Sequence, residues 1–244
     1  MSGRFSSLVH GWAAGPSLWS GIEPALARRF RVLRAAMPGY GNDAAGAGAG
    51  LEGLSTWLRG RTPGGATWLA WSTGALAALD IAAAGDGHIA RLNMVAPVVR
   101  FTRADDWPCG ADPDVLDEFR DQLGRDPGGL VRRFARLVMR PDGGRDGVER
   151  FVSAFADDRV SIAALSDGLD ILSAGDSRHR LRDVRIPVTI FHGDRDAVVP
   201  IESSRRAAAA IGDGRLCVLE GAGHAPFVTA PDEFIDQLER HGRH

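Results

Sequence analysis

Short apolar runs alternate with helix-length stretches along most of this 244-residue chain. Six runs have the length and composition of buried strands, at residues 5–9, 31–35, 67–70, 91–95, 188–191 and 215–219. Helical patterns separate most of them, at residues 18–29, 51–59, 73–84, 202–211 and 232–240. This alternation predicts an α/β fold, with a mostly parallel sheet and helices on both faces. The carboxyl ends of the strands then share one edge, where open α/β sheets bind their ligands.

The alternation stops between residues 95 and 188, where we predict helices and no strand. Four helical patterns lie there, at residues 113–123, 129–139, 147–156 and 160–172. A helical insert between two strands of such a sheet is typical of a cap over the strand ends. We therefore expect one domain over residues 1–244, made of a core (residues 1–97 and 184–244) and a helical cap (residues 98–183).

The composition narrows the class of partner and the compartment. The net charge is -2 and all 29 basic residues are arginine, which gives no overall argument for nucleic acid or an anionic membrane. We find neither a window of roughly 20 apolar residues nor the basic start and apolar run of a signal peptide. Two cysteines, Cys109 and Cys217, cannot frame a disulfide scaffold, which favours a reducing compartment. We expect a cytoplasmic monomer.

A candidate nucleophile lies in the segment Ala70-Trp71-Ser72-Thr73-Gly74, between a predicted strand and an alanine-rich helix. A serine on a tight strand-to-helix turn needs small neighbours two residues away on each side, as in the pattern G-x-S-x-G. Here Ala70 replaces the first glycine. The alternative is that Ser72 only caps the helix.

A base and its orienting acid follow later in the chain. His224 lies in a glycine-rich loop after the last predicted strand, and Asp196 follows the strand that ends at residue 191. The order Ser72, Asp196, His224 is that of the α/β-hydrolase triad. A solvated histidine and a helix-capping aspartate are the alternatives for these two residues. We interpret Asp194 as a turn former or as a group that supports the site from behind, and His192 as structural.

The same chemistry needs two backbone N–H groups that stabilise an oxyanion. We predict that Thr73, directly after Ser72, supplies one of them. The other is predicted at Trp12, which follows His10-Gly11 at the end of the first strand, and its indole is expected to line the acyl pocket.

Two other motifs carry no function in this interpretation. Residues 48–53 match G-x-G-x-x-G, but the strand that a dinucleotide site requires does not directly precede them. The two cysteines lack zinc-ligand spacing. Residues 44–50 are predicted to be a flexible loop. We predict no metal and no cofactor.

With these residues assembled, the chain resembles the α/β-hydrolase superfamily and, more narrowly, the pimeloyl-ACP methyl ester carboxylesterases of biotin synthesis. Three of the stretches that carry the likeness belong to the core, and the others to the predicted cap. They are His10-Gly11-Trp12, Trp71-Ser72, His224-Ala225-Pro226-Phe227, Asp106-Trp107-Pro108, Pro113-Asp114-Val115-Leu116, Arg133-Phe134 and Gly168-Leu169-Asp170-Ile171-Leu172.

The resemblance implies a serine esterase that hydrolyses the methyl ester of pimeloyl-acyl carrier protein. It implies Ser72 as nucleophile, Asp196 as acid and His224 as base. The substrate site would be lined by Trp12, Ser72, Thr73, Phe134, Val138 and His224. Ala70 and Val138 depart from the pattern of the relatives, and the strand pair that usually opens this fold is reduced. A short-chain esterase, another hydrolase of this fold and a non-catalytic binding module stay open as alternatives.

The charge of the predicted cap supports an acidic partner. Residues 125–150 hold seven arginines and four acidic residues, a local charge of +3 in a chain whose net charge is -2. A basic patch can steer an anionic partner such as an acyl carrier protein. The contacts are expected from Arg132, Arg133, Arg136 and Arg140. The alternative is a solvated helix face that is rich in arginine because of coding bias.

Overall fold

The computed structural model describes residues 5–41 and 50–241. Its strands are β1 (Phe5–Val9), β2 (Arg31–Ala35), β3 (Ala66–Trp71), β4 (Ile89–Val95), β5 (Val188–Gly193) and β6 (Gly214–Leu219). They form one six-stranded sheet in the order β2-β1-β3-β4-β5-β6, and every neighbouring pair is parallel. The predicted α/β sheet is confirmed. Within residues 5–41 and 50–241 this sheet has no antiparallel pair.

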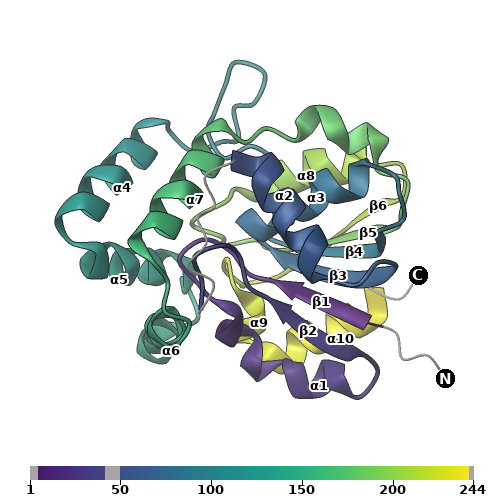
Figure 1. Ribbon diagram of the computed structural model, residues 1–244, viewed down its shortest axis with the longest axis horizontal. Coiled ribbons are helices and arrows are strands. Elements are labelled where there is room, and N and C mark those ends of the chain that lie inside the picture. Colours follow the sequence, from purple (N-terminus) through teal and green to yellow (C-terminus); the bar gives the residue numbers. More distant parts are fainter. Residues whose placement is uncertain (1–4, 42–49, 242–244) are drawn as a thin grey trace.

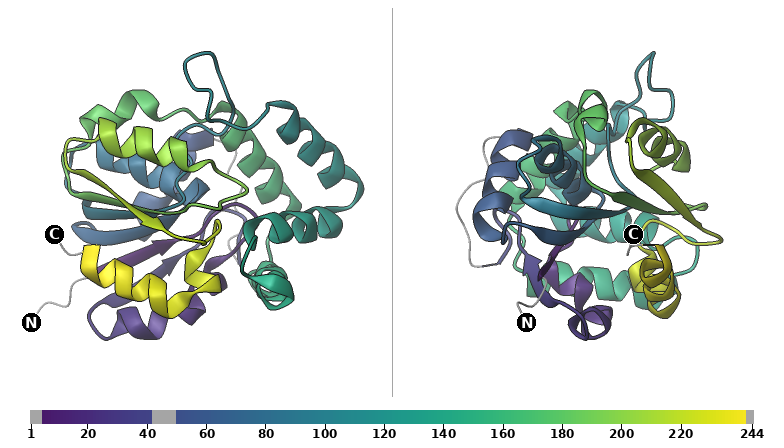
Figure 2. Two further views of the ribbon diagram at one scale, coloured as in Figure 1. Left: turned by 180° about the vertical axis from the view of Figure 1, so that it is seen from behind. Right: turned by 90° about the vertical axis from the view of Figure 1, so that its right-hand side faces the viewer.

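Helices cover both faces of the sheet (Figures 1 and 2). One face carries α2 (Gly50–Arg61), α3 (Thr73–Ala83) and α8 (Ile201–Ala210), and the other carries α1 (Glu23–Ala27), α9 (Pro226–Thr229) and α10 (Pro231–His241). β5 is buried along its whole length because both of its faces are covered. β2, at the edge of the sheet, is partly exposed.

Four helices follow β4 and precede β5, as predicted. They are α4 (Asp114–Arg125), α5 (Pro127–Val138), α6 (Gly144–Asp157) and α7 (Ile162–Ala174), here called the helical insert. The insert lies beyond the carboxyl ends of the strands, at the left of Figure 1. It contacts the core through α7, which packs on α2, and through α6, which packs on the 3-10 helix η1 (Pro16–Gly21).

The predicted helix over residues 18–29 is wrong as a single element. The chain forms η1 and then the short α1, with Ile22 between them at a φ of -108°. Pro24 explains the break, because proline has no N–H to donate and its ring clashes with the carbonyl group four residues earlier. The 3-10 helix η2 (Arg178–Asp183) and α9 are additional to the prediction. The predicted flexible loop lies outside the described residues, except for Gly50, which begins α2.

Candidate active site

Ser72 lies on a sharp turn between β3 and α3. Its backbone has φ +54° and ψ -118°, a left-handed conformation that is rare for a residue with a side chain. The turn is possible only beside a residue without a Cβ, because a Cβ at Gly74 would lie 2.3 Å from the carbonyl oxygen of His10. The strand–turn–helix geometry predicted for this segment is present, although Ala70 replaces the first glycine.

The structure joins Ser72, His224 and Asp196 in a hydrogen-bonded chain. Nε2 of His224 lies 3.0 Å from Oγ of Ser72, and Nδ1 of His224 lies 2.7 Å from Oδ2 of Asp196. Because a carboxylate only accepts, Nδ1 carries the proton and Nε2 is free to accept from the serine hydroxyl. Each residue comes from the loop after a different strand, β3, β6 and β5 respectively. This is the arrangement in which a histidine can deprotonate a serine for attack on an acyl carbon.

The Asp196 carboxylate is buried and held on both oxygens. Oδ1 accepts the backbone N–H groups of Val198 and Val199 at 2.7 and 2.9 Å. Burial alone would raise the pKa of Asp196, but the neighbouring His224 and a hydrogen bond from His192 outweigh it and hold that pKa well below its usual range. Asp196 is therefore ionised and able to stabilise a charged His224. Asp194 instead accepts the N–H of Gly221 at 2.7 Å, which ties the two loops together.

The backbone of His224 is fixed by two neighbours besides its side-chain partners. The indole Nε1 of Trp71, the residue before Ser72, donates to the carbonyl oxygen of His224 at 2.8 Å. On the other side, a Cβ at Gly223 would lie 1.7 Å from the carbonyl oxygen of Arg140, so the turn between α5 and α6 packs directly on the loop of the histidine. The helical insert thus contributes to the geometry of this site.

The loop after β1 lies against Ser72. A Cβ at Gly11 would lie 3.0 Å from Cβ of Ser72, so only glycine lets the backbone approach this closely. Within the described residues, no hydrogen bond engages the backbone N–H of Trp12 or Thr73. Both predicted oxyanion donors are therefore free to bind a ligand. His10 anchors the loop, because its buried ring accepts the N–H of Met37 at 3.0 Å.

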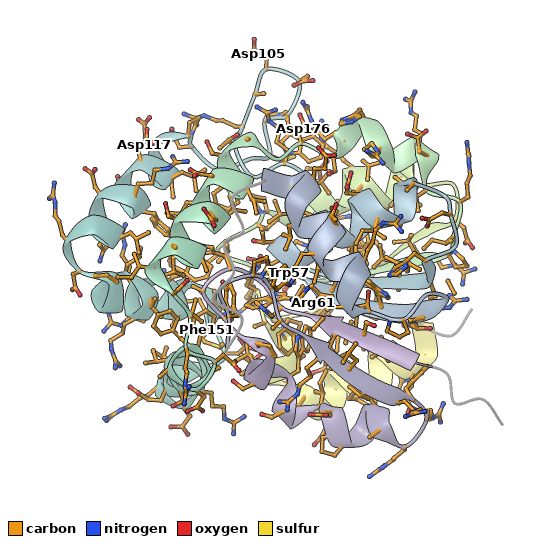
Figure 3. The ribbon with its side chains drawn as sticks, in the orientation of Figure 1. Trp57, Arg61, Asp105, Asp117, Phe151 and Asp176 are labelled. Atoms are coloured by element: carbon orange, nitrogen blue, oxygen red, sulfur yellow. The ribbon has the colours of Figure 1, made fainter. Side chains whose placement is uncertain are left out.

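Aromatic side chains of the insert surround Trp12. Its ring centroid lies 4.8 Å from that of Phe134 in α5 and 5.8 Å from that of Phe119 in α4. Phe151 of α6, labelled in Figure 3, packs edge-on against Phe134 at 5.9 Å. Phe134, predicted to line the substrate site, therefore lies beside the loop of the predicted oxyanion donor. Val138, one turn further along α5, is fully buried.

The four predicted carrier-contact arginines differ in their partners. Arg132 pairs with Glu149 at 2.8 Å, and Arg133 pairs with Glu118 at 3.3 Å. Arg136 and Arg140 are exposed, and neither has an ion pair with any residue that the structure describes. The unpaired positive charge therefore lies at the carboxyl-terminal end of α5, on Arg136, and in the turn that follows, on Arg140, whose backbone packs on Gly223.

Other regions of the described chain do not share this chemistry. A cavity of about 300 Å³ lies between α1, α10 and the sheet, where Ser6, Thr67 and Asn93 line it and no predicted site residue does. Among residues 5–41 and 50–241, no group of three or more His, Cys, Asp or Glu residues is arranged to hold a metal ion. No helix in those same ranges is long and apolar enough to span a membrane.

Comparisons with known proteins show the family to which this chain belongs. The α/β hydrolase family matches residues 8–237. Two curated relatives are both named pimeloyl-[acyl-carrier protein] methyl ester esterase. The protein from Aromatoleum aromaticum is 35% identical over 95% of each chain, and the one from Pectobacterium carotovorum is 32% identical over 95% of this chain and 91% of its own.

Solved structures show the same fold at lower sequence identity. An esterase from Exiguobacterium antarcticum and a bromoperoxidase from Bacillus anthracis each have a TM-score of 0.89 at 22% identity, covering 100% of this chain and 93% of theirs. The chain therefore belongs to the α/β-hydrolase family, as a carboxylic ester hydrolase related to the pimeloyl-[acyl-carrier protein] methyl ester esterases.

Proposed function

We propose that this chain is a serine esterase that hydrolyses the methyl ester of pimeloyl-acyl carrier protein, a step of biotin synthesis. The observation that carries the proposal is the hydrogen-bonded chain from Ser72 through His224 to Asp196 at the strand ends. The names of the relatives at 32–35% identity supply the substrate. A cytoplasmic monomer is part of the proposal.

The proposed reaction has two stages. His224 Nε2 takes the hydroxyl proton of Ser72 as Oγ attacks the ester carbonyl, and the N–H groups of Trp12 and Thr73 stabilise the oxyanion. His224 then gives its proton to the methoxy group, which leaves as methanol. In the second stage His224 activates a water that releases the acid from Ser72. Asp196 stabilises the charged imidazole in both stages.

The helical insert would receive the carrier protein. We treat residues 98–183 as a cap on a core of residues 1–97 and 184–244. Arg136 and Arg140 offer charge that no described acidic residue neutralises, and the backbone of Arg140 packs on the loop of His224. An acidic carrier held at this end of α5 would present its acyl chain close to the reacting groups. Phe134 and Trp12 supply apolar surface for that chain.

A fluorophosphonate probe tests the chemistry directly. The folded protein should be labelled on Ser72, and Ser72→Ala should lose the label, while Ser203→Ala, a buried serine of α8, should keep it. Absence of labelling in the folded wild-type protein would contradict the serine-hydrolase proposal.

The substrate is tested separately, by mass spectrometry of pimeloyl-acyl carrier protein methyl ester and by rescue of a biotin auxotroph that lacks its own esterase. We expect demethylation and growth, both lost in Ser72→Ala. A protein that reacts with the probe and cleaves small esters, but neither demethylates the carrier-bound ester nor rescues growth, would be a general carboxylesterase.

A further inference from the structure

Asp196 has a second histidine beside it, in addition to His224. Nε2 of His192 lies 3.2 Å from Oδ2 of Asp196, the same oxygen that faces Nδ1 of His224 at 2.7 Å. Behind His192, its Nδ1 lies 2.7 Å from Oγ of Ser204 in α8. One carboxylate oxygen is thus flanked by two histidines, and each histidine contacts one serine.

The protonation of His192 follows from its partners. Nε2 also lies 2.9 Å from the carbonyl oxygen of Val199, and a carbonyl group can only accept. Nε2 therefore carries a proton, which it shares between Val199 and Asp196. In the neutral ring Nδ1 then accepts from the hydroxyl of Ser204. His192 can therefore only donate to Asp196. It stabilises the charged carboxylate and does not compete with it for the Nδ1 proton of His224.

Because the site is buried, the hydrogen bond from His192 to Asp196 cannot be replaced by water. The side chains of His192 and Asp196 are both 0% exposed, so water cannot replace a lost hydrogen bond there. Oδ1 of Asp196 already has two backbone donors. Without His192, Oδ2 would keep only His224, and the carboxylate would be held less firmly in the plane that suits His224. The imidazole of His224 would then lose its fixed orientation toward Ser72.

We infer that His192 is a positioning residue for the reaction proposed above, that it fixes the Asp196 carboxylate against His224, and that Ser204 fixes His192. The inference rests on the proposed function. It goes beyond the proposed function because it extends the hydrogen-bond chain of the site from Ser72 to α8, which packs on β5 and β6. A residue that only packs between β5 and α8 would influence stability and leave turnover of the folded enzyme unchanged.

Two amide variants of His192 separate these roles. Gln is long enough to place its N–H where the imidazole Nε2 lies, whereas Asn reaches only the Nδ1 position and leaves Asp196 without its second donor. We expect His192→Gln to keep kcat within about 3-fold and His192→Asn to lose about 10- to 100-fold, the range for a hydrogen bond to a charged group. KM for a small p-nitrophenyl ester should change less than kcat.

Two adjacent serines of α8 provide a matched pair. Ser203 and Ser204 are both buried, but Ser203 Oγ has no hydrogen-bond partner in the described part of the chain, while Ser204 Oγ contacts His192. Ser204→Ala should lower kcat about 3- to 10-fold, about one hydrogen bond, and Ser203→Ala should leave it unchanged. Thermal unfolding of each variant checks that the protein is folded at the temperature at which kcat is measured. Equal kcat in both serine variants, or a loss in His192→Gln as large as in His192→Asn, would overturn the inference.

Proton NMR gives a readout that does not need turnover. The proton between His224 Nδ1 and Asp196 should resonate far downfield, and it should move in His192→Asn and Ser204→Ala but not in Ser203→Ala. An unmoved resonance in folded His192→Asn would contradict the positioning role even if the wild-type protein proved to cleave no ester. Failure of fluorophosphonate labelling in the wild-type protein, in contrast, would overturn the proposed function alone.

Discussion

The indole nitrogen of Trp12 donates a hydrogen bond to the carbonyl oxygen of Leu165 at 2.9 Å, which joins the loop after β1 to α7 of the helical insert. The fit is close, because a Cβ at Gly168 would lie 2.3 Å from the indole ring. The backbone N–H of Trp12 is also a proposed oxyanion donor. The position of that donor therefore depends on the insert as well as on the core.

Trp12→Phe should lower kcat about 5-fold, because it keeps an aromatic ring but removes a hydrogen bond worth about 1 kcal/mol. Trp57→Phe is the control, since the indole of Trp57 also donates to a backbone carbonyl, that of Ala36, at 3.1 Å. Trp57 lies in α2, where the guanidinium of Arg61 stacks on its ring at 3.3 Å (Figure 3). Steady-state kinetics with a small ester checks the pair, and an equal loss in both variants would argue against a coupling through Leu165.

Gly74→Ala should abolish most activity and destabilise the fold by about 1–3 kcal/mol, the usual cost of overpacking. The added methyl group would collide with the carbonyl oxygen of His10, which cannot move without shifting the loop of Trp12. Gly60→Ala, in α2, meets nothing within 4 Å and should stabilise the protein by about 0.5–1 kcal/mol. Urea unfolding and ester hydrolysis measure both effects. A fully active Gly74→Ala would mean that the turn tolerates a Cβ.

Charge reversal of Arg136 and Arg140 together should lower kcat/KM for the carrier-bound ester about 10-fold at low salt and leave a small p-nitrophenyl ester unaffected. Arg132 and Arg133 should matter less, because each already pairs with a glutamate. Rising salt should weaken the wild-type preference, since it screens exposed charges.

Arg28→Glu, which reverses an exposed arginine at the end of α1, is the control for a charge reversal elsewhere on the surface. It should leave kcat/KM for the carrier-bound ester near the wild-type value. Equal losses on carrier-bound and small esters would show that Arg136 and Arg140 do not steer the carrier.

His10 should make stability depend on pH. Burial lowers the pKa of His10 from 6.5 to about 4, against opposing hydrogen bonds to backbone groups. Between these values the unfolded chain binds a proton that the folded chain does not. The free energy of unfolding therefore falls as the pH drops from about 6.5 to about 4, by about 3 kcal/mol for this residue, and is unaffected by His10 above that window.

His10→Gln should be less stable than the wild-type protein at pH 7.5 and should lose less stability on acidification. Urea unfolding at several pH values between 4 and 7.5 measures the difference in slope. Parallel pH profiles for the two proteins would show that His10 does not titrate in this window.

The part of the candidate site that follows directly from the ends of the strands could be predicted from the sequence. In a parallel sheet each strand delivers its following loop to one edge, so Ser72, Asp196 and His224 converge whatever the details of the helices. The role of His192 was not visible in this way. Its contact with Asp196 depends on the turn between them and on which face of β5 it occupies, and neither follows from its position at the end of an apolar run.

The helical regions show a similar division. The periodicity of the four insert helices predicted them to within a few residues, because each has an apolar face to bury. Residues 18–29 also have a helical pattern, yet Pro24 divides them into η1 and α1. The sequence also did not predict that Arg132 and Arg133 have ion pairs while Arg136 and Arg140 have none within the described residues. These ion pairs depend on α4 and α6 lying beside α5.

The hydrogen bond from Trp71 to the carbonyl oxygen of His224 has a practical consequence. It joins the turn of the nucleophile to the loop of the base through groups that take no part in bond breaking. The variant Ser72→Ala should therefore keep the binding site for the ester intact although it cannot cleave the ester. When this variant is immobilised, it should bind intact methyl esters of acyl carrier proteins. The bound esters could then be identified and crystallised with it.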